Sequence, residues 1–234
     1  MFRDRLHAGQ LLARAVSAEI RQQDRREVVV LALPRGGVPV ASPVASELHA
    51  PLDVLLVRKL GLPGEGEVAI GAIASGGIRV LNQDLIEQCG ISGSTIDRIA
   101  EKEQQEIERQ ELRFGACSLH LQNLIVVVVD DGLATGATMR AAVSALRKRL
   151  PRMIIAAVPV GAQKACAALR SDAGSLICLE TPEPFVSVGR SYRDFSQTSD
   201  DEVRAILIAH RRRYSPADLR SGLDAAEAKK RRSE

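Results

Sequence analysis

The stretch VVVVDDGLATGAT, residues 126–138, joins a hydrophobic run to a loop of small residues. Its four valines predict a buried strand of a parallel sheet, because such strands are covered on both faces and are rich in β-branched residues along their whole length. Helical periodicity resumes at about Ala137, so the loop connects a strand to a helix. Two adjacent carboxylates, Asp130 and Asp131, therefore lie at the carboxyl end of the strand, where open α/β sheets bind their ligands.

The loop has the features of an anion-binding site. Its backbone N–H groups and the hydroxyls of Thr135 and Thr138 face the positive end of the helix dipole. Gly132 and Gly136 permit positive φ and close approach of a ligand to the backbone. Two carboxylates would repel a phosphate directly beside them. A ribose that separates the carboxylates from the phosphate removes this conflict, because its hydroxyls donate to the carboxylates while its 5-phosphate reaches the loop. The GxxxxGK[ST] and GxGxxG patterns of other nucleotide sites are absent, so the stretch predicts a ribose 5-phosphate site.

Short hydrophobic strands alternate with amphipathic helices along the chain. Periodicity predicts strands at residues 27–33, 53–57, 123–130, 153–160 and 175–180, and helices at residues 5–23, 38–49, 92–113, 137–149 and 163–171. This order is typical of a parallel sheet with helices on both faces, so we expect an α/β fold.

Three further segments are expected from local patterns. Residues 58–67 carry charges and glycines and are predicted to form a loop. Residues 68–74 and 77–82 are predicted to be extended and to form a hairpin. Ser199 and Glu202 form a capping-box pattern, which predicts one more helix immediately after them.

Composition narrows the class of protein. The chain has 234 residues, 45% hydrophobic and 26% charged, which is sufficient for one globular α/β domain with a real core. No apolar run reaches the roughly 18 residues that cross a bilayer, and the first ten residues lack the apolar segment of a signal peptide. We therefore expect a cytoplasmic protein with no membrane partner. The four cysteines and four histidines match no zinc-binding spacing, so we expect reduced, partly buried thiols.

The basic charge is concentrated at the C-terminal end. Residues 211–234 carry eight Lys or Arg and four Asp or Glu, a net charge of +4, whereas the whole chain carries only +3. The rest of the chain is thus nearly neutral and, with six aromatic residues in the whole chain, lacks the stacking surface of a single-strand binder. These features argue against nucleic acid as a partner, and the tail is expected to be a solvated helix, with weak nucleic-acid contact as the alternative.

VVVVDDGLATGAT resembles the thirteen-residue signature that binds 5-phosphoribosyl 1-pyrophosphate (PRPP) in type I phosphoribosyltransferases. The resemblance implies a parallel sheet flanked by helices, with a small hood subdomain. The family domain would span residues 1–213, with the hood formed by about 1–26 and 181–213, and 214–234 would be a charged tail. Asp130 and Asp131 would bind the ribose hydroxyls and Mg²⁺. The 5-phosphate would be bound by Gly132, Leu133, Ala134, Thr135, Gly136, Ala137 and Thr138.

Two more segments resemble parts of the family site that hold the leaving group. PRGG, residues 34–37, is similar to the pyrophosphate loop, which implies that Arg35, Gly36 and Gly37 bind pyrophosphate. RKLGLPG, residues 58–64, is similar to the segment that leads into the mobile catalytic loop of adenine-type members. Arg58 and Lys59 would neutralise pyrophosphate. Glu67, at the end of the expected mobile loop, is our candidate for the general base.

The acceptor is less well defined. EPFVSVGRSYRDF, residues 183–195, resembles the hood of hypoxanthine-type enzymes with one extra residue of spacing, which implies base contacts from Phe185, Val186 and Asp194; a packed core aromatic is the alternative role of Phe185. Ala134 and Ala137 replace the acid and the lysine of hypoxanthine-guanine enzymes, which argues against that activity. The N-terminal hood of adenine-type members has no match.

Together these features predict a Mg²⁺-dependent enzyme that transfers ribose 5-phosphate from PRPP to a nucleobase or related nitrogen heterocycle and releases pyrophosphate. The family resemblance also implies a homo-oligomer. The alternative is a non-catalytic regulator that senses PRPP, with RNA as one conceivable partner of the tail. Arg58 and Lys59 favour the enzyme, since a sensor needs no loop that closes over a leaving group. A Rossmann-type oxidoreductase ranks third, for want of its glycine pattern.

Overall fold

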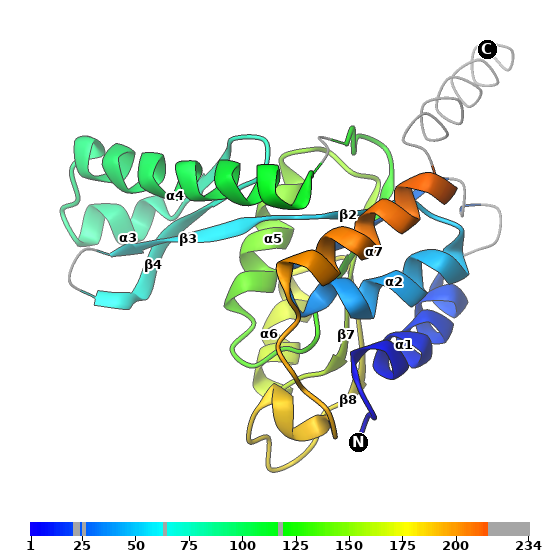
Figure 1. Ribbon diagram of the computed structural model, residues 1–234. Coiled ribbons are helices and arrows are strands. Elements are labelled where there is room, and N and C mark those ends of the chain that lie inside the picture. Colours follow the sequence, from blue (N-terminus) through cyan, green and yellow to red (C-terminus); the bar gives the residue numbers. More distant parts are fainter. Residues whose placement is uncertain (21–23, 25–26, 63–64, 117–118, 215–234) are drawn as a thin grey trace, which may run out of the picture.

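The computed structural model describes residues 1–214 apart from 21–23, 25–26, 63–64 and 117–118. Its centre is a five-stranded parallel sheet in the order β2-β1-β6-β7-β8 (Figure 1). The strands are β1 (Val28–Ala32), β2 (Leu52–Val54), β6 (Ile125–Val129), β7 (Met153–Val160) and β8 (Ser175–Glu180). The predicted α/β class and its parallel sheet are confirmed.

Helices cover both faces of this sheet (Figure 1). They are α1 (Arg5–Glu19), α2 (Gly37–Leu48) and α7 (Asp200–Arg213) on one face, and α5 (Ala137–Arg147) and α6 (Gln163–Asp172) on the other. Successive residues of β6 alternate between the two cores: Val127 packs with the first group of helices and Val128 with the second. This burial on both sides explains the uninterrupted valine run.

The prediction of a loop at residues 58–67 is wrong for residues 58–62 and 65–67, and residues 63–64 lie outside the described residues. Residues 58–62 and 65–67 belong to an antiparallel three-stranded sheet, in the order β3-β4-β5, that extends away from the parallel sheet (Figure 1). Its strands are β3 (Val57–Leu62), β4 (Glu65–Ala74) and β5 (Ile78–Leu81). The predicted strand 53–57 is therefore divided between two sheets. The expected hairpin is confirmed, since β4 and β5 pair across a turn in which Gly76 and Gly77 have positive φ.

Two helices complete this extension, which we call the arm (residues 57–114). They are α3 (Gln83–Gln88), which was not predicted, and α4 (Gly93–Phe114), which confirms the charged helix. The strand character of the arm comes from tertiary packing: Leu60, Ile70 and Ile107 are fully buried between the sheet and α4. The glycines and charged residues in this segment interrupt the alternation of hydrophobic residues, so periodicity did not predict these strands.

Arg149, just beyond the end of α5, fastens the arm to the main body. Its guanidinium donates from Nη2 to the carbonyl oxygen of Ser75, in the β4–β5 turn, at 2.7 Å. It also donates from Nη1 to the carbonyl oxygen of Leu119 at 3.2 Å. Burial lowers the pKa of Arg149, although the group keeps its partners on both sides.

Helix α1 lies unusually close to α2 because residue 9 is glycine. A Cβ atom at Gly9 would lie 2.4 Å from the carbonyl oxygen of Val40, closer than atoms can pack. Helix α1 ends at Glu19, so the predicted helix of residues 5–23 extends too far at Ile20, whose backbone is extended, and residues 21–23 lie outside the described residues. The close approach places the first turn of α1 beside the start of α2.

The N-terminal residues and the segment after β8 lie together. The backbone N–H of Phe2 donates to Ser191 at 2.7 Å, and that of Arg193 donates to Phe2 at 2.8 Å. Phe2 and Tyr192 form a small third core at 2% and 5% exposure. The division into hood, main domain and tail stays a prediction, and the tail from residue 215 onward lies outside the described residues.

Other expectations concern side chains and membranes. Ser199 caps α7 by accepting a hydrogen bond from the backbone N–H of Glu202 at 3.2 Å, which confirms the predicted helix start.

Cys89, Cys166 and Cys178 are free thiols, whereas Cys117 lies outside the described residues. None of the described helices combines the length and the apolar character that a bilayer crossing requires.

His210 links α7 to α2 and makes stability depend on pH. The side chain is 5% exposed, and its Nε2 lies 3.0 Å from the hydroxyl of Ser42. Burial lowers the pKa of His210, and the positive charge of Arg213 lowers it further. The unfolded chain therefore binds this proton more tightly than the folded one, so the native state loses stability as the pH falls.

We expect His210→Gln to reduce this loss, because glutamine stays neutral. Urea unfolding between about pH 7.5 and pH 5, which spans the ordinary histidine range, should show a smaller fall in the free energy of unfolding for the variant than for the parent. The exposed His120→Gln serves as the control and should keep the parental slope. Equal slopes for His210→Gln and the parent would contradict the prediction.

Candidate functional site

The two carboxylates predicted from the sequence lie at the carboxyl edge of the parallel sheet, directly after β6. Asp130 accepts a hydrogen bond through Oδ1 from the backbone N–H of Asp131 at 2.8 Å. Burial raises the pKa of Asp130 well above its usual range, and the charge of Asp131 raises it further. Burial also raises the pKa of Asp131, while Arg5 acts in the opposite direction. A cation bound beside the pair would therefore stabilise the ionised form of both carboxylates.

The predicted pyrophosphate loop packs directly against this pair. Strands β1 and β6 are parallel neighbours with Ala32 opposite Val129, so the segments that follow them meet. A Cβ atom on Gly36 would lie 2.0 Å from Oδ2 of Asp131. A Cβ atom on Gly37 would lie 2.6 Å from the carbonyl oxygen of Val129. Glycine is thus required at both positions by close packing, and the loop shares one site with the acid pair.

Within the predicted phosphate loop, residues 132–138, some residues are buried and hold the loop in place, whereas others are exposed. Leu133 is buried and its backbone N–H donates to Val160 at 2.8 Å, so this residue anchors the loop instead of offering a free amide. Ala134, Thr135 and Thr138 are exposed. Gly136 has φ of 76° immediately before α5, the conformation for which glycine is suited. The other two residues are Gly132, which is partly buried beside Val188, and Ala137, the first residue of α5.

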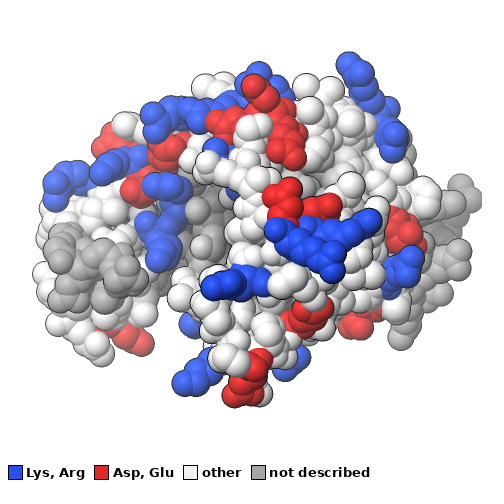
Figure 2. All heavy atoms as spheres, turned by 60° about the horizontal axis from the view of Figure 1, so that its bottom comes forward, with Lys and Arg blue, Asp and Glu red and all other residues white. Residues whose placement is uncertain are grey.

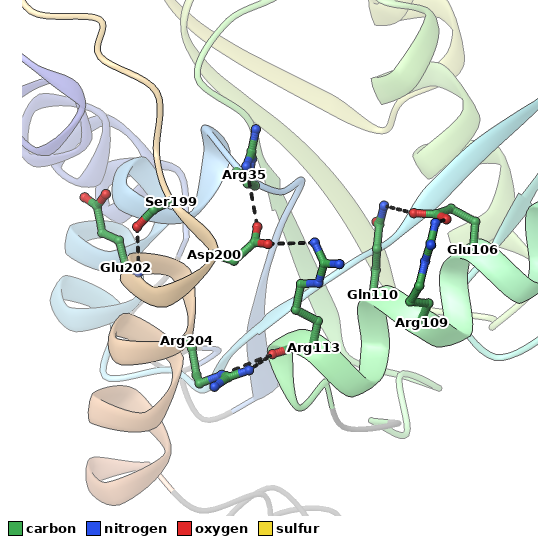
Figure 3. Close-up of polar contacts among 9 residues, drawn as sticks. All are labelled: Arg35, Glu106, Arg109, Gln110, Arg113, Ser199, Asp200, Glu202 and Arg204. Carbon is green, nitrogen blue, oxygen red and sulfur yellow. Dashed lines mark hydrogen bonds and ion pairs between the residues drawn. The ribbon is translucent and has the colours of Figure 1, made fainter.

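Arg35, the basic residue of the pyrophosphate loop, is held at a junction of three elements (Figure 3). Its Nη1 lies 3.5 Å from Oδ1 of Asp200, at the start of α7, and Arg113 donates to the other oxygen of Asp200 at 2.7 Å. Arg204 in turn donates to the backbone oxygen of Arg113 at 2.8 and 3.1 Å. Arg113, at the end of α4, is a second guanidinium beside the pyrophosphate loop that sequence patterns did not single out.

Arg58 and Lys59 lie in β3, the first strand of the arm. Arg58 donates through Nε to Glu103 of α4 at 2.7 Å. Lys59 lines a cavity of about 650 Å³ between the arm and α5, and Ala137 lines the same cavity. The backbone of Glu67 belongs to β4, but its side chain lies outside the described residues, so its proposed role as a base stays untested.

The cavity is lined by both basic and acidic side chains, the acidic ones being Asp84 and Asp172. Arg140 and Arg147 of α5 face it together with Lys59 of the arm. The face turned forward in Figure 2 is hollowed between the arm and the main body, with Lys and Arg side chains at its border. Arg140 is itself paired with Asp172 at 2.6 Å. The structure thus places Lys59 and Ala137, near the end of the predicted phosphate loop, on one cavity.

The three predicted base-binding residues are distributed differently. Phe185 packs, partly buried, against the third core near Phe2 and Tyr192. Val186 is 70% exposed. Asp194 is exposed and accepts a hydrogen bond from the backbone N–H of Ser196 at 2.9 Å, which lowers its pKa. The proposed base contacts of these three residues stay a prediction.

Three residues that the sequence did not single out contact the acid pair or its neighbours. Arg5 forms an ion pair with Asp131 at 2.8 Å, and Tyr192 donates its hydroxyl to the backbone oxygen of Asp131 at 2.6 Å. Phe195 packs against Tyr192 with ring centroids 5.0 Å apart. Tyr192 and Phe195 belong to the hood-like segment 183–195, so their position could have been noticed. No local pattern marks Arg5, which lies 126 residues from its partner.

Comparisons with known proteins find a matching family model and similar curated proteins. A family model described as the phosphoribosyl transferase domain matches residues 3–193. A Mycobacterium tuberculosis protein, Rv0571c, which carries a provisional phosphoribosyl transferase name, is 43% identical over 228 residues, 97% of this chain and 50% of its own; the counterpart from a second strain, MT0597, matches equally. The chain thus spans about half the length of these curated relatives.

One solved structure is similar to this chain over nearly the full length of the solved chain. The crystal structure of TT1426 from Thermus thermophilus has a TM-score of 0.81 and 39% sequence identity, and the match covers 89% of this chain and 98% of that one. The family match includes the acid pair, the phosphate loop and the pyrophosphate loop. The chain therefore belongs to the phosphoribosyl transferase domain family.

Proposed function

We propose that the protein transfers ribose 5-phosphate from PRPP to a nitrogen nucleophile and releases pyrophosphate, in a Mg²⁺-dependent reaction. One observation carries the proposal: Gly36 packs so closely against Asp131 that a pyrophosphate on the first loop and a ribose on the second would be adjacent. This is the separation that PRPP requires, because its pyrophosphate is attached to C1 of the same ribose.

Each part of PRPP has a matching surface. The ribose hydroxyls donate to Asp130 and Asp131, and the 5-phosphate accepts from the exposed end of the loop, where Thr135 and Thr138 offer hydroxyls. Leu133 contributes by holding the loop to Val160. The pyrophosphate lies on the loop of Arg35, Gly36 and Gly37. In this arrangement the carboxylates contact hydroxyls and the cations contact phosphates.

The two carboxylates also suit Mg²⁺. Among the described residues no group of three or more His, Cys, Asp or Glu side chains could enclose a metal. Mg²⁺ is commonly bound by one or two carboxylates, with waters and substrate phosphates as the other ligands. Burial and the charge of Asp131 raise the pKa of Asp130, and a bound cation would offset both effects. When bound by Asp130 and Asp131, the cation would disperse charge on the pyrophosphate and orient the ribose.

Catalysis would depend mainly on the leaving group. Cleavage at C1 of the ribose develops oxocarbenium character, as in glycoside hydrolysis, so stabilising the departing pyrophosphate lowers the barrier. Arg35 is the basic side chain of the pyrophosphate loop, and Arg58 and Lys59 of the arm provide further positive charge. Arg58 would have to leave Glu103, and Arg35 would have to leave Asp200, to contact it fully. No covalent enzyme intermediate is required.

For the acceptor we propose a nucleobase or a related nitrogen heterocycle, bound beside the hood. Phe195 packs against Arg5, the partner of Asp131, and is 37% exposed, whereas Phe185 packs into the third core. Phe195 is therefore better placed than Phe185 to contact a ring.

A PRPP sensor is the second candidate, and the ion pairs favour it. Asp131, Arg35 and Arg58 each have a protein partner of opposite charge in this structure. If PRPP only replaced the protein partners in these ion pairs, its binding would change the protein without any chemical reaction, as a sensor requires. The two candidates differ in whether pyrophosphate is released.

We expect Asp130→Asn to weaken Mg²⁺-dependent PRPP binding by about ten- to a hundredfold, because a hydrogen bond to a charged group contributes about 1.5–3 kcal/mol. The fold should persist, since the substitution removes a buried charge. Isothermal titration with PRPP and Mg²⁺ measures the affinity. Asp97→Asn, on the arm and 70% exposed, is the matched control. Parental affinity in Asp130→Asn would remove this carboxylate from the ribose site.

We expect Gly36→Ala to weaken PRPP binding by about tenfold or more, because the added methyl group would displace Asp131 and disturb its charged hydrogen bonds. Gly93→Ala is the control, since a Cβ atom there meets nothing within 4 Å. The same titration compares both variants, with thermal unfolding as a check of the fold. If Gly36→Ala bound PRPP as the parent does, the shared site would be excluded.

Turnover separates the enzyme from the sensor. We expect the protein with PRPP and Mg²⁺ to release pyrophosphate when a panel of purines, pyrimidines and other nitrogen heterocycles is supplied. A coupled pyrophosphate assay measures the rate for each acceptor, and Asp130→Asn gives the background. Tight PRPP binding with no release for any acceptor would favour the sensor.

A further inference from the structure

The guanidinium of Arg5 is the point at which three segments of the candidate site meet. Its Nε and Nη2 both lie 2.8 Å from Oδ2 of Asp131. Its Nη1 donates to the backbone oxygen of Ser196 at 2.7 Å. A Cβ atom on Gly36 would lie 3.2 Å from Nε. Arg5 therefore contacts the ribose carboxylate, the segment after the hood aromatics and the edge of the pyrophosphate loop.

Packing holds Arg5 in this place. The side chain is 12% exposed and that of Asp131 16%, so the pair is largely shielded from water. The centre of the guanidinium lies 3.9 Å from the centroid of the Phe195 ring, at cation–π distance. One helical turn further along α1, Gly9 allows the close approach to α2. Arg5 is thus oriented by its helix as well as by its partners.

We propose that Arg5 is a positioning residue of the PRPP site: it orients Asp131 for the ribose and couples that carboxylate to the hood segment of residues 192–196. The inference rests on the proposed function and assigns a role to a residue of the first helix. Arg5 itself need not contact PRPP.

The geometry of the pair explains the positioning role. Both donors of Arg5 converge on Oδ2, so they fix the rotation of the Asp131 carboxylate and leave Oδ1 as an acceptor for a ribose hydroxyl. Tyr192 restrains the same residue from its backbone side, with a hydrogen bond of 2.6 Å. Asp130 is adjacent, and two neighbouring carboxylates repel each other. A cation on Asp131 offsets that repulsion and keeps the pair together.

The contacts with the hood give the coupling. Ser196 and Phe195 hold the same guanidinium that holds Asp131, so a displacement of this segment by an acceptor would be felt at the ribose carboxylate. A planar guanidinium with several donors can satisfy these partners together, whereas an ammonium presents a single nitrogen. The position therefore requires arginine and not only a positive charge.

The test compares Arg5→Gln, Arg5→Lys and Arg5→Ala with Arg3→Gln. Arg3 is exposed and two residues away, so its variant makes the same change of charge on the same segment. Isothermal titration with PRPP and Mg²⁺, the KM for PRPP, kcat and thermal unfolding are measured for each protein. Binding to Arg5→Ala is repeated with millimolar guanidinium chloride, which can refill the position of the lost group.

Arg5→Gln is expected to weaken PRPP binding and raise its KM by about tenfold, because a charged hydrogen-bonded pair is lost. Arg5→Lys should recover only part of the affinity, guanidinium should improve binding to Arg5→Ala, and Arg3→Gln should match the parent. These results in folded proteins would support the inference.

Parental affinity in folded Arg5→Gln, or full recovery by lysine with no effect of guanidinium on the alanine variant, would overturn the inference and leave the proposed function intact. Absence of PRPP binding by the parent protein would overturn both. A fall in unfolding temperature with unchanged affinity would assign Arg5 a purely structural role and also reject the inference.

Discussion

The parallel pairing of β1 with β6 is the constraint on which the site depends. With Ala32 opposite Val129, the two chains leave the sheet side by side, one into Pro34–Gly37 and the other into Asp130 and Asp131. Because parallel strands end at the same edge, residues about a hundred positions apart become neighbours. The glycines allow the last approach, since side chains there would overlap the carboxylates or the backbone.

Charge compensation is the second theme of the site. The candidate site combines a carboxylate pair with the guanidiniums of Arg5 and Arg35, and Asp131 and both arginines already have protein partners of opposite charge. Such pairs keep the groups oriented where solvent is partly excluded. When the substrate binds, each charged side chain would exchange its protein partner for a phosphate oxygen or a hydroxyl. The number of contacts that each side chain makes would then change little.

Much of the fold was predictable from the sequence because the relevant signals are local. The valine run, the helical periodicity of α4 and the capping box at Ser199 each report a property of a few neighbouring residues, and each agrees with the structure. The arm was not predictable in the same way. Its strands owe their form to burial of Leu60 and Ile70 under Ile107, contacts between residues far apart in sequence.

The site shows the same division. The acid pair and the glycine loops lie in contiguous motifs, so the sequence indicated both segments, and the structure places them in contact. The partners of those motifs are remote: Arg5 joins Asp131, Asp200 joins Arg35, and Glu103 joins Arg58. A single sequence contains no periodicity or spacing that would relate such residues, because only the fold brings them together.

The attachment of Arg149 to the arm has a mechanical consequence. Helix α5 starts at Ala137, where the phosphate loop ends, and Arg149 just beyond its other end is bonded to Ser75 in the arm. A helix of this length is stiff, so a tilt imposed at one end would be carried to the other. The inclination of the antiparallel sheet that includes Lys59 would then be linked to the position of the loop at residues 132–138.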